Sequence, residues 1–173
     1  MQHQSNSQTL CDPEKIRIKD DCKSLCQQYN CTYESEYEKR ESIFNQLFSY
    51  HGKNLSIRPP FRCEFGKNIF LGDNVVMNFD CVIEDTANVT IGDNTLLAPR
   101  VKIFCSSREN KIDGNRNIEI GENVWIGGGV TIHSGVFIGN NVTIGAGSVV
   151  LNDIPSDCVA VGNPCKVIRC LEK

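Results

Sequence analysis

Hydrophobic positions recur every sixth residue through the second half of the chain, and glycine often follows them. The series runs without a break through Ile120, Ile126, Ile132, Ile138, Ile144 and Val150. Neither the period of about 3.6 residues of an α-helix nor the period of about two residues of a strand explains this spacing alone. Six residues suit a short strand plus a tight turn, because residues of equal parity point to one side and glycine tolerates the turn.

These units predict coils that stack on one another. A single coil buries too little apolar surface to be stable alone, whereas stacked coils pair their backbones and bury a continuous column of isoleucine and valine. Segments that begin at Leu71 and Ile91 follow the same spacing with offsets, so we predict a hexapeptide-repeat domain over residues 69–155. Residues 104–117 break the period and are predicted to leave the coil as an extruded loop.

The first third of the chain has the periodicity of helices instead. Asp12 and Pro13 fit the N-cap and the first position of a helix. Apolar and cysteine residues follow at helical spacing, namely Ile18, Cys22, Leu25, Cys26 and Tyr29. A second amphipathic segment begins near residue 35, so we predict an α-helical hairpin within residues 12–53 whose apolar faces need another surface to cover.

The remaining segments are assigned by their composition. Residues 54–68 contain Pro59 and Pro60, which disfavour helix, and are predicted to be a connector. Residues 1–11 are expected to be a flexible N-terminus and residues 156–173 a short C-terminal tail. With 173 residues, 40% of them hydrophobic, the chain is long enough for one core and too short for two large domains.

Charge and hydropathy narrow the possible partners. The formal net charge is −3 and the isoelectric point near 5.6, so no broad basic field is available for nucleic acid or an anionic membrane. No apolar stretch approaches the roughly 18–20 residues that span a bilayer, and the first ten residues lack the pattern of a signal peptide. We therefore expect a cytoplasmic protein that binds neither nucleic acid nor membrane.

The cysteine content could suggest disulfides or a metal. The chain has ten cysteines, but it lacks a secretion signal and has enough aliphatic residues for an ordinary core, so free thiols are expected. The spacing of Cys22, Cys26 and Cys31 contains no C-x-x-C, and the three histidines lie far away in the sequence. We therefore expect no metal.

An ordered set of motifs resembles a known enzyme family. The stretches NFDC, TIGDNTLLAPRV, IGENVWIGGGV, IGAGSVVLNDIP and VGNPCKVIR follow a YEKRES helix in this order. Together they resemble the maltose and galactoside O-acetyltransferases over residues 12–171. The resemblance implies an all-β core that forms a left-handed parallel β-helix of hexapeptide repeats, with an N-terminal α-helical hairpin. It also implies a homotrimer with acetyl-CoA, the acyl donor, in the groove between neighbouring subunits.

The resemblance fails at the residue that should carry the chemistry. In the family the acceptor hydroxyl of a sugar attacks the acetyl thioester while a loop histidine takes its proton. Arg108 occupies that histidine's place here, and an arginine that stays protonated cannot be a general base. Arg108 could be a solvated loop residue, an anion clamp for an acidic acceptor, or a stabiliser of the thioester oxygen. His51, His133 and an acyl-carrying Cys105 are weak substitutes for the missing base.

The resemblance carries over better on the cofactor side. Gly128 and Ala146 match residues whose backbones line the cofactor groove, and Lys166 matches a basic residue near the CoA phosphates. Trp125 matches a tryptophan along the thioester end, and Asn78 an asparagine that holds the acceptor. Each has a structural alternative: a coil-bonding amide for Asn78, an interface residue for Trp125, and a solvated tail residue for Lys166.

Two functions follow from these expectations. The first is an acetyl-CoA-dependent O-acetyltransferase that acts at trimer interfaces on a sugar-like hydroxyl acceptor, which could be an anionic sugar recognised by Arg108. The alternative is a pseudoenzyme of the same fold that binds CoA or a sugar without efficient turnover. A carbonic anhydrase on a similar coil is excluded, because its zinc needs three histidines and those of this chain, at positions 3, 51 and 133, are too dispersed to converge.

Replacing Arg108 with histidine supplies the residue type that the family uses as a base. We expect Arg108→His to raise acetylation of maltose or a galactoside, because a positioned general base contributes about 10²–10⁴-fold in rate. The rate of acetyl transfer to each sugar measures this, with Arg108→Gln as the control that removes the charge and adds no base. An unchanged rate would mean that the acceptor pocket itself differs from that of the family.

Overall fold

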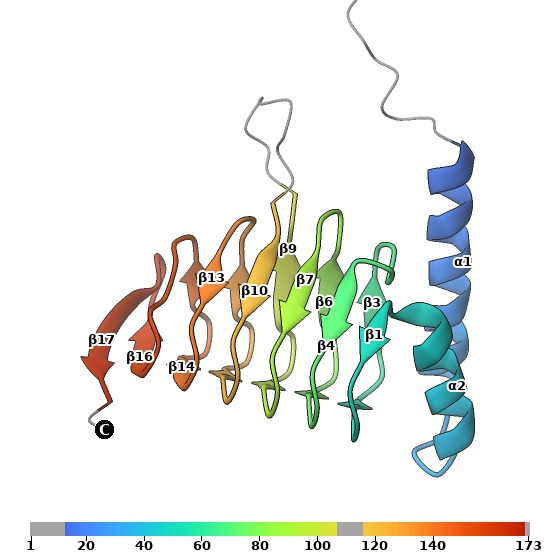
Figure 1. Ribbon diagram of the computed structural model, residues 1–173, viewed down its shortest axis with the longest axis horizontal. Coiled ribbons are helices and arrows are strands. Elements are labelled where there is room, and N and C mark those ends of the chain that lie inside the picture. The colour runs from blue at the N-terminus through green and yellow to red at the C-terminus, as the bar shows by residue number, and fades with distance from the viewer. Residues whose placement is uncertain (1–12, 107–115, 172–173) are drawn as a thin grey trace, which may run out of the picture.

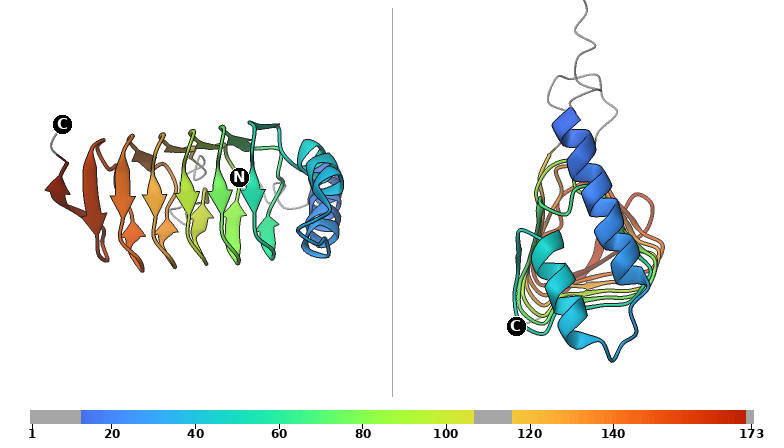
Figure 2. Two further views of the ribbon diagram at one scale, coloured as in Figure 1. Left: turned by 90° about the horizontal axis from the view of Figure 1, so that it is seen from below. Right: turned by 90° about the vertical axis from the view of Figure 1, so that its right-hand side faces the viewer.

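Short parallel strands stack into three sheets that run the length of the molecule, and two helices cover one end (Figure 1). The computed structural model describes residues 13–106 and 116–171. Seen end-on, successive coils follow one three-sided outline, with α1 (Pro13–Asn30) and α2 (Tyr37–Leu47) lying across it (Figure 2). This is the expected all-β core, a parallel β-helix with a helical hairpin at its start.

Each of the five complete coils contributes one strand to each sheet, and the last two strands extend one sheet further. Sheet A contains β1 (Tyr50–His51), β4 (Ile69–Leu71), β7 (Val89–Ile91), β10 (Ile118–Ile120) and β13 (Phe137–Ile138). Sheet B contains β2 (Ser56–Ile57), β5 (Val76–Met77), β8 (Leu96–Leu97), β11 (Trp125–Ile126), β14 (Val142–Ile144), β16 (Cys158–Val161) and β17 (Lys166–Cys170). Sheet C contains β3 (Phe61–Cys63), β6 (Cys81–Glu84), β9 (Lys102–Phe104), β12 (Thr131–Ile132) and β15 (Val149–Val150). The strand pairs are parallel except for β16 and β17.

The six-residue period is the repeat of the inward-facing side chains. The series from Ile120 to Val150 is buried throughout, at 2% exposure or less. The residues two places before them, such as Val124 before Ile126, are buried as well. Trp125, between these two, points outward and is 57% exposed. Each side of a coil therefore reads in, out, in, which is the alternation of a strand repeated once per face.

The turn from sheet A to sheet B explains the glycine that follows the aliphatic residue. At Gly92 an added Cβ would lie 2.7 Å from the carbonyl carbon of Gly121 in the next coil, so the neighbouring backbone leaves no room for a side chain. Two residues later an asparagine takes the left-handed conformation, with φ of 57° at Asn54 and Asn74 and 56° at Asn94. The amides of these asparagines form a ladder between coils, with Nδ2 to Oδ1 distances of 2.9 Å.

The turn from sheet C to sheet A absorbs the differences in coil length. Paired residues of sheet B, namely Ser56, Val76, Leu96, Trp125 and Thr143, are separated by 20, 20, 29 and 18 residues. The longest of these coils contains residues 105–117, which connect β9 to β10. The extruded loop predicted at residues 104–117 falls here, and its central part, residues 107–115, lies outside the described residues.

The helical hairpin covers the open edge of the first coil. Asn30, the last residue of α1, accepts a hydrogen bond from the backbone N–H of Phe61 at 2.8 Å and donates one to its carbonyl at 3.0 Å. The Tyr29 hydroxyl donates to the carbonyl of Ile57, and its buried position raises the pKa of Tyr29 to about 12. Strand edges left unpaired attract other chains, so α1 satisfies backbone groups that would otherwise be exposed.

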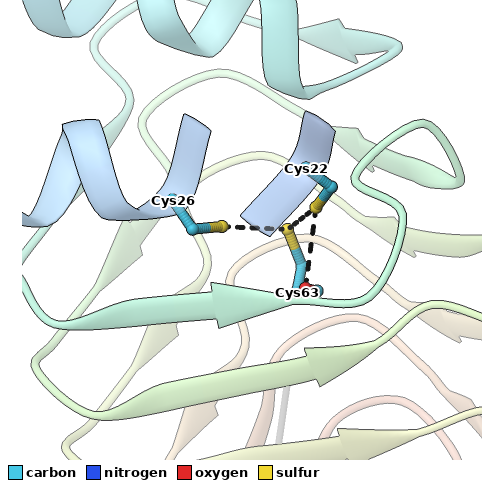
Figure 3. Close-up of side chains that lie close together, drawn as sticks. All are labelled: Cys22, Cys26 and Cys63. Carbon is cyan, nitrogen blue, oxygen red and sulfur yellow. Dashed lines mark hydrogen bonds between the residues drawn. The ribbon is translucent and has the colours of Figure 1, made fainter. Parts of the chain in front are cut away.

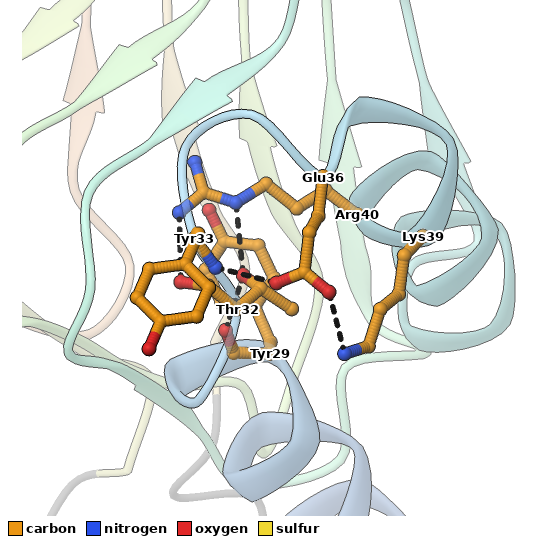
Figure 4. Close-up of polar contacts among 6 residues, drawn as sticks. All are labelled: Tyr29, Thr32, Tyr33, Glu36, Lys39 and Arg40. Atoms are coloured by element: carbon orange, nitrogen blue, oxygen red, sulfur yellow. Dashed lines mark hydrogen bonds and ion pairs between the residues drawn. The ribbon is translucent and has the colours of Figure 1, made fainter.

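A polar network fixes the turn between the two helices (Figure 4). Glu36 accepts hydrogen bonds from the Tyr33 backbone N–H at 2.6 Å and from Lys39 at 2.9 Å, and the former is the main reason that the pKa of Glu36 is lowered. Arg40 donates to the Thr32 hydroxyl at 2.9 Å. The Arg40 guanidinium also lies over the Tyr29 ring, 5.4 Å from its centre. Arg40 of α2 is thereby held against Tyr29 of α1, whose hydroxyl contacts the first coil.

The coil is longer at both ends than the sequence analysis predicts. Residues 54–68 are not a connector, since β2 and β3 within them pair in parallel with β5 and β6. Pro60 lies at a turn before β3, where a missing N–H is tolerated, and Ile57 and Phe61 point into the core. The expected tail begins with two strands of sheet B, because β16 extends it in parallel and β17 closes it in the antiparallel direction.

None of the helices within the described ranges has the length and apolar character needed to cross a bilayer.

Replacing Gly92 tests the close approach of neighbouring coils. We expect Gly92→Ala to lower the free energy of unfolding by about 1–3 kcal/mol, the usual range for overpacking against backbone that cannot move aside. Denaturant unfolding measures this change. Gly128→Ala is the matched control, because a Cβ there would first meet the Pro99 oxygen at 3.4 Å, an ordinary contact. Equal stability of the two variants would contradict this account of the turn.

Candidate functional site

Three of the predicted site residues share the turn between sheets B and C. Gly128 and Ala146 occupy the same position of neighbouring coils, because Ile126 pairs with Ile144 two residues earlier. The backbone N–H of Gly147 donates to the carbonyl of Gly128 at 2.9 Å, which fixes the two turns against each other. Asn78 lies at this turn in an earlier coil, one position before the level of Gly128. Register therefore aligns these residues along one edge of the molecule.

Trp125 lies on the face of sheet B that leads to this edge. It points outward from β11 and is 57% exposed, and its paired neighbour Leu96 on β8 is 38% exposed. Val76 follows in the same row on β5. An exposed row of large apolar side chains is typical of a surface that contacts a ligand or another protein. We call this row of Val76, Leu96 and Trp125 the sheet B strip.

Lys166 begins the last strand and is exposed. It pairs with Val161 of β16 across the antiparallel end of sheet B. The same strand carries Val167, which is 39% exposed, and Ile168, which is 64% exposed. The positive charge of Lys166 therefore lies at the C-terminal end of sheet B. This is the sheet that carries Trp125, and Lys166 lies beyond the coil of Ala146.

Asn78 has both a structural and a chemical capacity. Its side-chain oxygen accepts a hydrogen bond from the backbone N–H of Phe79 at 2.9 Å, which is the structural role expected of an amide at a turn. The side chain is half-buried. The amide nitrogen is a second group with two protons to donate. A hydroxyl acceptor could be bound by this nitrogen while the oxygen holds the turn.

Arg58 is a neighbour of Asn78 that the sequence analysis missed. Ile57 pairs with Met77, so Arg58 follows at the level of Asn78 in the preceding coil, and its side chain is exposed. Arg58, Arg40 and Phe79 line a hollow beside the helical hairpin. Residues 54–68 were predicted to be a connector, so Arg58 was not placed on a coil. The apolar Ile57 immediately before Arg58 was the one sign in the sequence that a strand of the coil lies here.

Within the described residues, the groups considered as substitutes for the missing base lie away from this edge. Arg108 falls outside the described residues. Cys105 is fully buried, and burial raises its pKa to about 11, so it is neither accessible nor ionised enough to carry an acyl group. The His51 ring lies beside Phe44 under the helical hairpin, with Nε2 3.7 Å from Glu41. His133 lies at the turn from sheet C to sheet A beside the Phe104 ring, 6.4 Å away between ring centres.

A second group of chemically active side chains lies between α1 and the first coil. Cys22 and Cys26 of α1 meet Cys63 of β3, and their three sulfur atoms lie within 4.8 Å of one another. Cys31, which the sequence places in the same run of cysteines, is exposed and does not belong to this group. The four-residue spacing of Cys22 and Cys26 places them on one helix face. The third thiol, Cys63, lies within residues 54–68, which were predicted to be a connector and not part of a coil.

Comparison with known proteins gives the same fold and a consistent set of relatives. Residues 117–152 match the family described as bacterial transferase hexapeptide (six repeats), and residues 10–52 match the maltose acetyltransferase hexapeptide capping motif. The galactoside O-acetyltransferase of Escherichia coli (strain K12) is 44% identical over 154 residues, which cover 85% of this chain and 76% of that protein.

Two solved structures superpose closely on the chain. The maltose O-acetyltransferase from Clostridium difficile 630 has a TM-score of 0.89 and 44% identity, and the alignment covers 94% of this chain and 90% of that one. A galactoside acetyltransferase in complex with coenzyme A also has a TM-score of 0.89, with 39% identity over 95% of this chain and 85% of its own. The similarity therefore extends over the helical hairpin as well as the coils.

Proposed function

The chain belongs to the family of the galactoside and maltose O-acetyltransferases, and we propose that it transfers the acetyl group of acetyl-CoA to a hydroxyl of a sugar-like acceptor. The alignment of Trp125, Gly128 and Ala146 along one face and edge of the coil carries this proposal. A long thiol-bearing donor needs an extended surface with little side chain in its path, and the residues at this edge are glycine and alanine. The relatives named above include one solved with coenzyme A.

Each residue along this edge has a role that suits its chemistry. Gly128 and Ala146 keep the turn narrow, so backbone groups could approach the pantetheine arm of the donor. Trp125 offers an aromatic face against which the thioester end could pack. Lys166, at the end of sheet B, carries a flexible ammonium that suits a point-charge contact with a phosphate of CoA.

The reaction moves one acetyl group and one proton. The acceptor oxygen attacks the carbonyl carbon of the thioester, the carbon–sulfur bond breaks, and the hydroxyl proton passes through a base to the departing thiolate. Arg108 cannot be that base, because a guanidinium has no lone pair to offer. The base is therefore proposed to come from a neighbouring subunit, or else the rate depends on positioning alone. Arg108 keeps the proposed role of a positive group in the loop.

The acceptor is proposed to lie beside Asn78. The half-buried amide nitrogen of Asn78 can donate to an acceptor oxygen while the amide oxygen keeps its bond to Phe79. Arg58 at the same level adds a positive charge that would favour an acceptor with a carboxylate or phosphate group. This agrees with the interpretation of Arg108 as an anion clamp and favours an anionic sugar over a neutral disaccharide.

A homotrimer is proposed because the sheet B strip is exposed in the single chain. Trp125 and Leu96 would be covered if this face packed against a neighbouring subunit, and the edge with Gly128 and Ala146 would then become one wall of a groove. Two subunits would share each groove under this arrangement. The pseudoenzyme alternative has no observation in its favour among the relatives or in the described residues.

Acetyl transfer tests the proposed chemistry and the role of Lys166. We expect the protein to acetylate a sugar or sugar nucleotide from a panel faster than the reaction without enzyme. We expect Lys166→Ala to raise the KM for acetyl-CoA on the order of tenfold, the loss of about 1.4 kcal/mol in one phosphate contact, and to change kcat little. Lys102→Ala, an exposed lysine on sheet C, is the control. Intact CoA binding with no transfer to any acceptor would contradict the proposed reaction.

The oligomeric state tests the proposed use of the sheet B strip. We expect Leu96→Asp to convert the trimer to smaller species, because a charge would be buried without a partner in the subunit interface. Sedimentation equilibrium measures the mass in solution. Tyr33→Asp is the control, since Tyr33 is 78% exposed on the helical hairpin, away from this strip. A wild-type protein that sediments as a single chain would contradict the trimer directly.

A further inference from the structure

The three thiols of Cys22, Cys26 and Cys63 converge between α1 and the first coil (Figure 3). The Cys63 sulfur lies 3.5 Å from that of Cys22 and 3.7 Å from that of Cys26. Cys22 and Cys26 are 2% and 5% exposed, and Cys63 is partly exposed. We define these three residues as the thiol cluster. It belongs to neither the proposed transfer site nor the sheet B strip.

The distances agree with those of a thiolate metal site. Zinc binds thiolate sulfur at about 2.3 Å, and tetrahedral geometry then places two sulfur ligands about 3.8 Å apart. The two separations of 3.5 and 3.7 Å lie close to this value. The sulfurs of the third pair, Cys22 and Cys26, lie within 4.8 Å of each other, so movement of the side chains would bring all three around one ion.

An ion bound at this cluster would be held by thiolates. A divalent cation stabilises thiolates by direct coordination and displaces their protons, so the contacts among the three thiols do not oppose its binding.

The donor set selects the kind of metal. Three soft thiolates without a carboxylate suit Zn²⁺ and other thiophilic ions, and they suit Mg²⁺ or Ca²⁺ poorly. Within the described residues no histidine, aspartate or glutamate joins the group. The nearby Asp85 carboxylate is occupied by the backbone N–H groups of Glu64 and Phe65, each at 2.9 Å. The fourth position of a tetrahedral ion would therefore be left to water or a small external ligand.

An approach to the cluster is present on the surface. Cys22 forms part of the wall of a groove between the two helices, whose other lining residues include Leu25, Gln28 and Phe65. An ion could reach the sulfur of Cys22 through this groove. Buried cysteines often serve only as small apolar side chains. Here the sulfur of Cys63 contacts those of both Cys22 and Cys26, which is also the arrangement that a shared ion needs.

We propose that Cys22, Cys26 and Cys63 bind Zn²⁺ through three thiolates, with water or a small external ligand in the fourth coordination position. The site joins α1 to the first coil, beside the hydrogen bonds with which Asn30 and Tyr29 cover the open edge of that coil. The bound ion stabilises this contact, and it takes no part in acetyl transfer. The proposal does not depend on the proposed function.

Metal titration of the reduced full-length protein tests the site. We expect Co²⁺, added after chelation and in the presence of a phosphine reductant, to give the visible absorption of a tetrahedral thiolate site. The signal should saturate at about one ion per chain, and Zn²⁺ should abolish it because it binds thiolate sites more tightly. We also expect Zn²⁺ to protect three cysteines from iodoacetamide. Mass spectrometry of the digested protein should identify them as Cys22, Cys26 and Cys63.

Variants separate this site from the other cysteines. Cys63→Ser should lose the cobalt signal and the rise in melting temperature, about 5 °C, that we expect Zn²⁺ to give the wild type. Cys31→Ser, which changes an exposed cysteine just after α1, should keep both. Absence of the cobalt signal in the wild type would overturn the proposal. Equal alkylation of the three thiols with and without Zn²⁺ would also overturn it. The same holds if mass spectrometry finds two of the three cysteines joined by a disulfide after reduction and treatment with Zn²⁺. The alkylation experiment needs no variant, so it decides the question even if Cys63→Ser fails to fold.

Discussion

The hydrogen bonding of each coil to the next is the constraint on which the rest of the structure depends. A parallel strand pair satisfies the backbone groups of both partners only if the register is kept, so every coil must present the same kind of residue at the same level. Isoleucine and valine fill the inside because they suit short, buried strands. Gly92 and its equivalents occupy the turn because the next coil passes too closely for a side chain. Site residues such as Gly128 and Ala146 become neighbours through the same register.

The ends of the stack need a different solution. The first coil has no preceding coil to pair with, and α1 supplies the Asn30 amide and the Tyr29 hydroxyl instead. At the other end β17 turns back along β16, which replaces a parallel neighbour by an antiparallel one. A repeat architecture is stable only if its terminal units differ from the internal ones. The thiol cluster lies at one of these ends, where an additional link between helix and coil has the most to stabilise.

The central coils and the helical hairpin could be predicted from the sequence, and the first coil and the last strands could not. From Ile120 to Val150 the period is strict, so the pattern alone indicates stacked coils. Residues 54–68 belong to a coil of 20 residues, in which the irregular turn and two prolines hide the same alternation. The handedness of the coil does not follow from periodicity at all, because the general preference for right-handed crossovers points the other way. It was available only through the resemblance to a family.

Because the turn from sheet C to sheet A absorbs the differences in coil length, this fold can accept an inserted segment there without a change in the register of its strands. The coil that contains residues 105–117 has 29 residues where its neighbours have 20 and 18, yet β9 and β10 on either side of that segment keep their pairing with β12 and β7. A segment spliced in at this corner would therefore leave all three faces unchanged. Sequence changes at this turn can therefore alter which ligand is recognised while the coil stays the same.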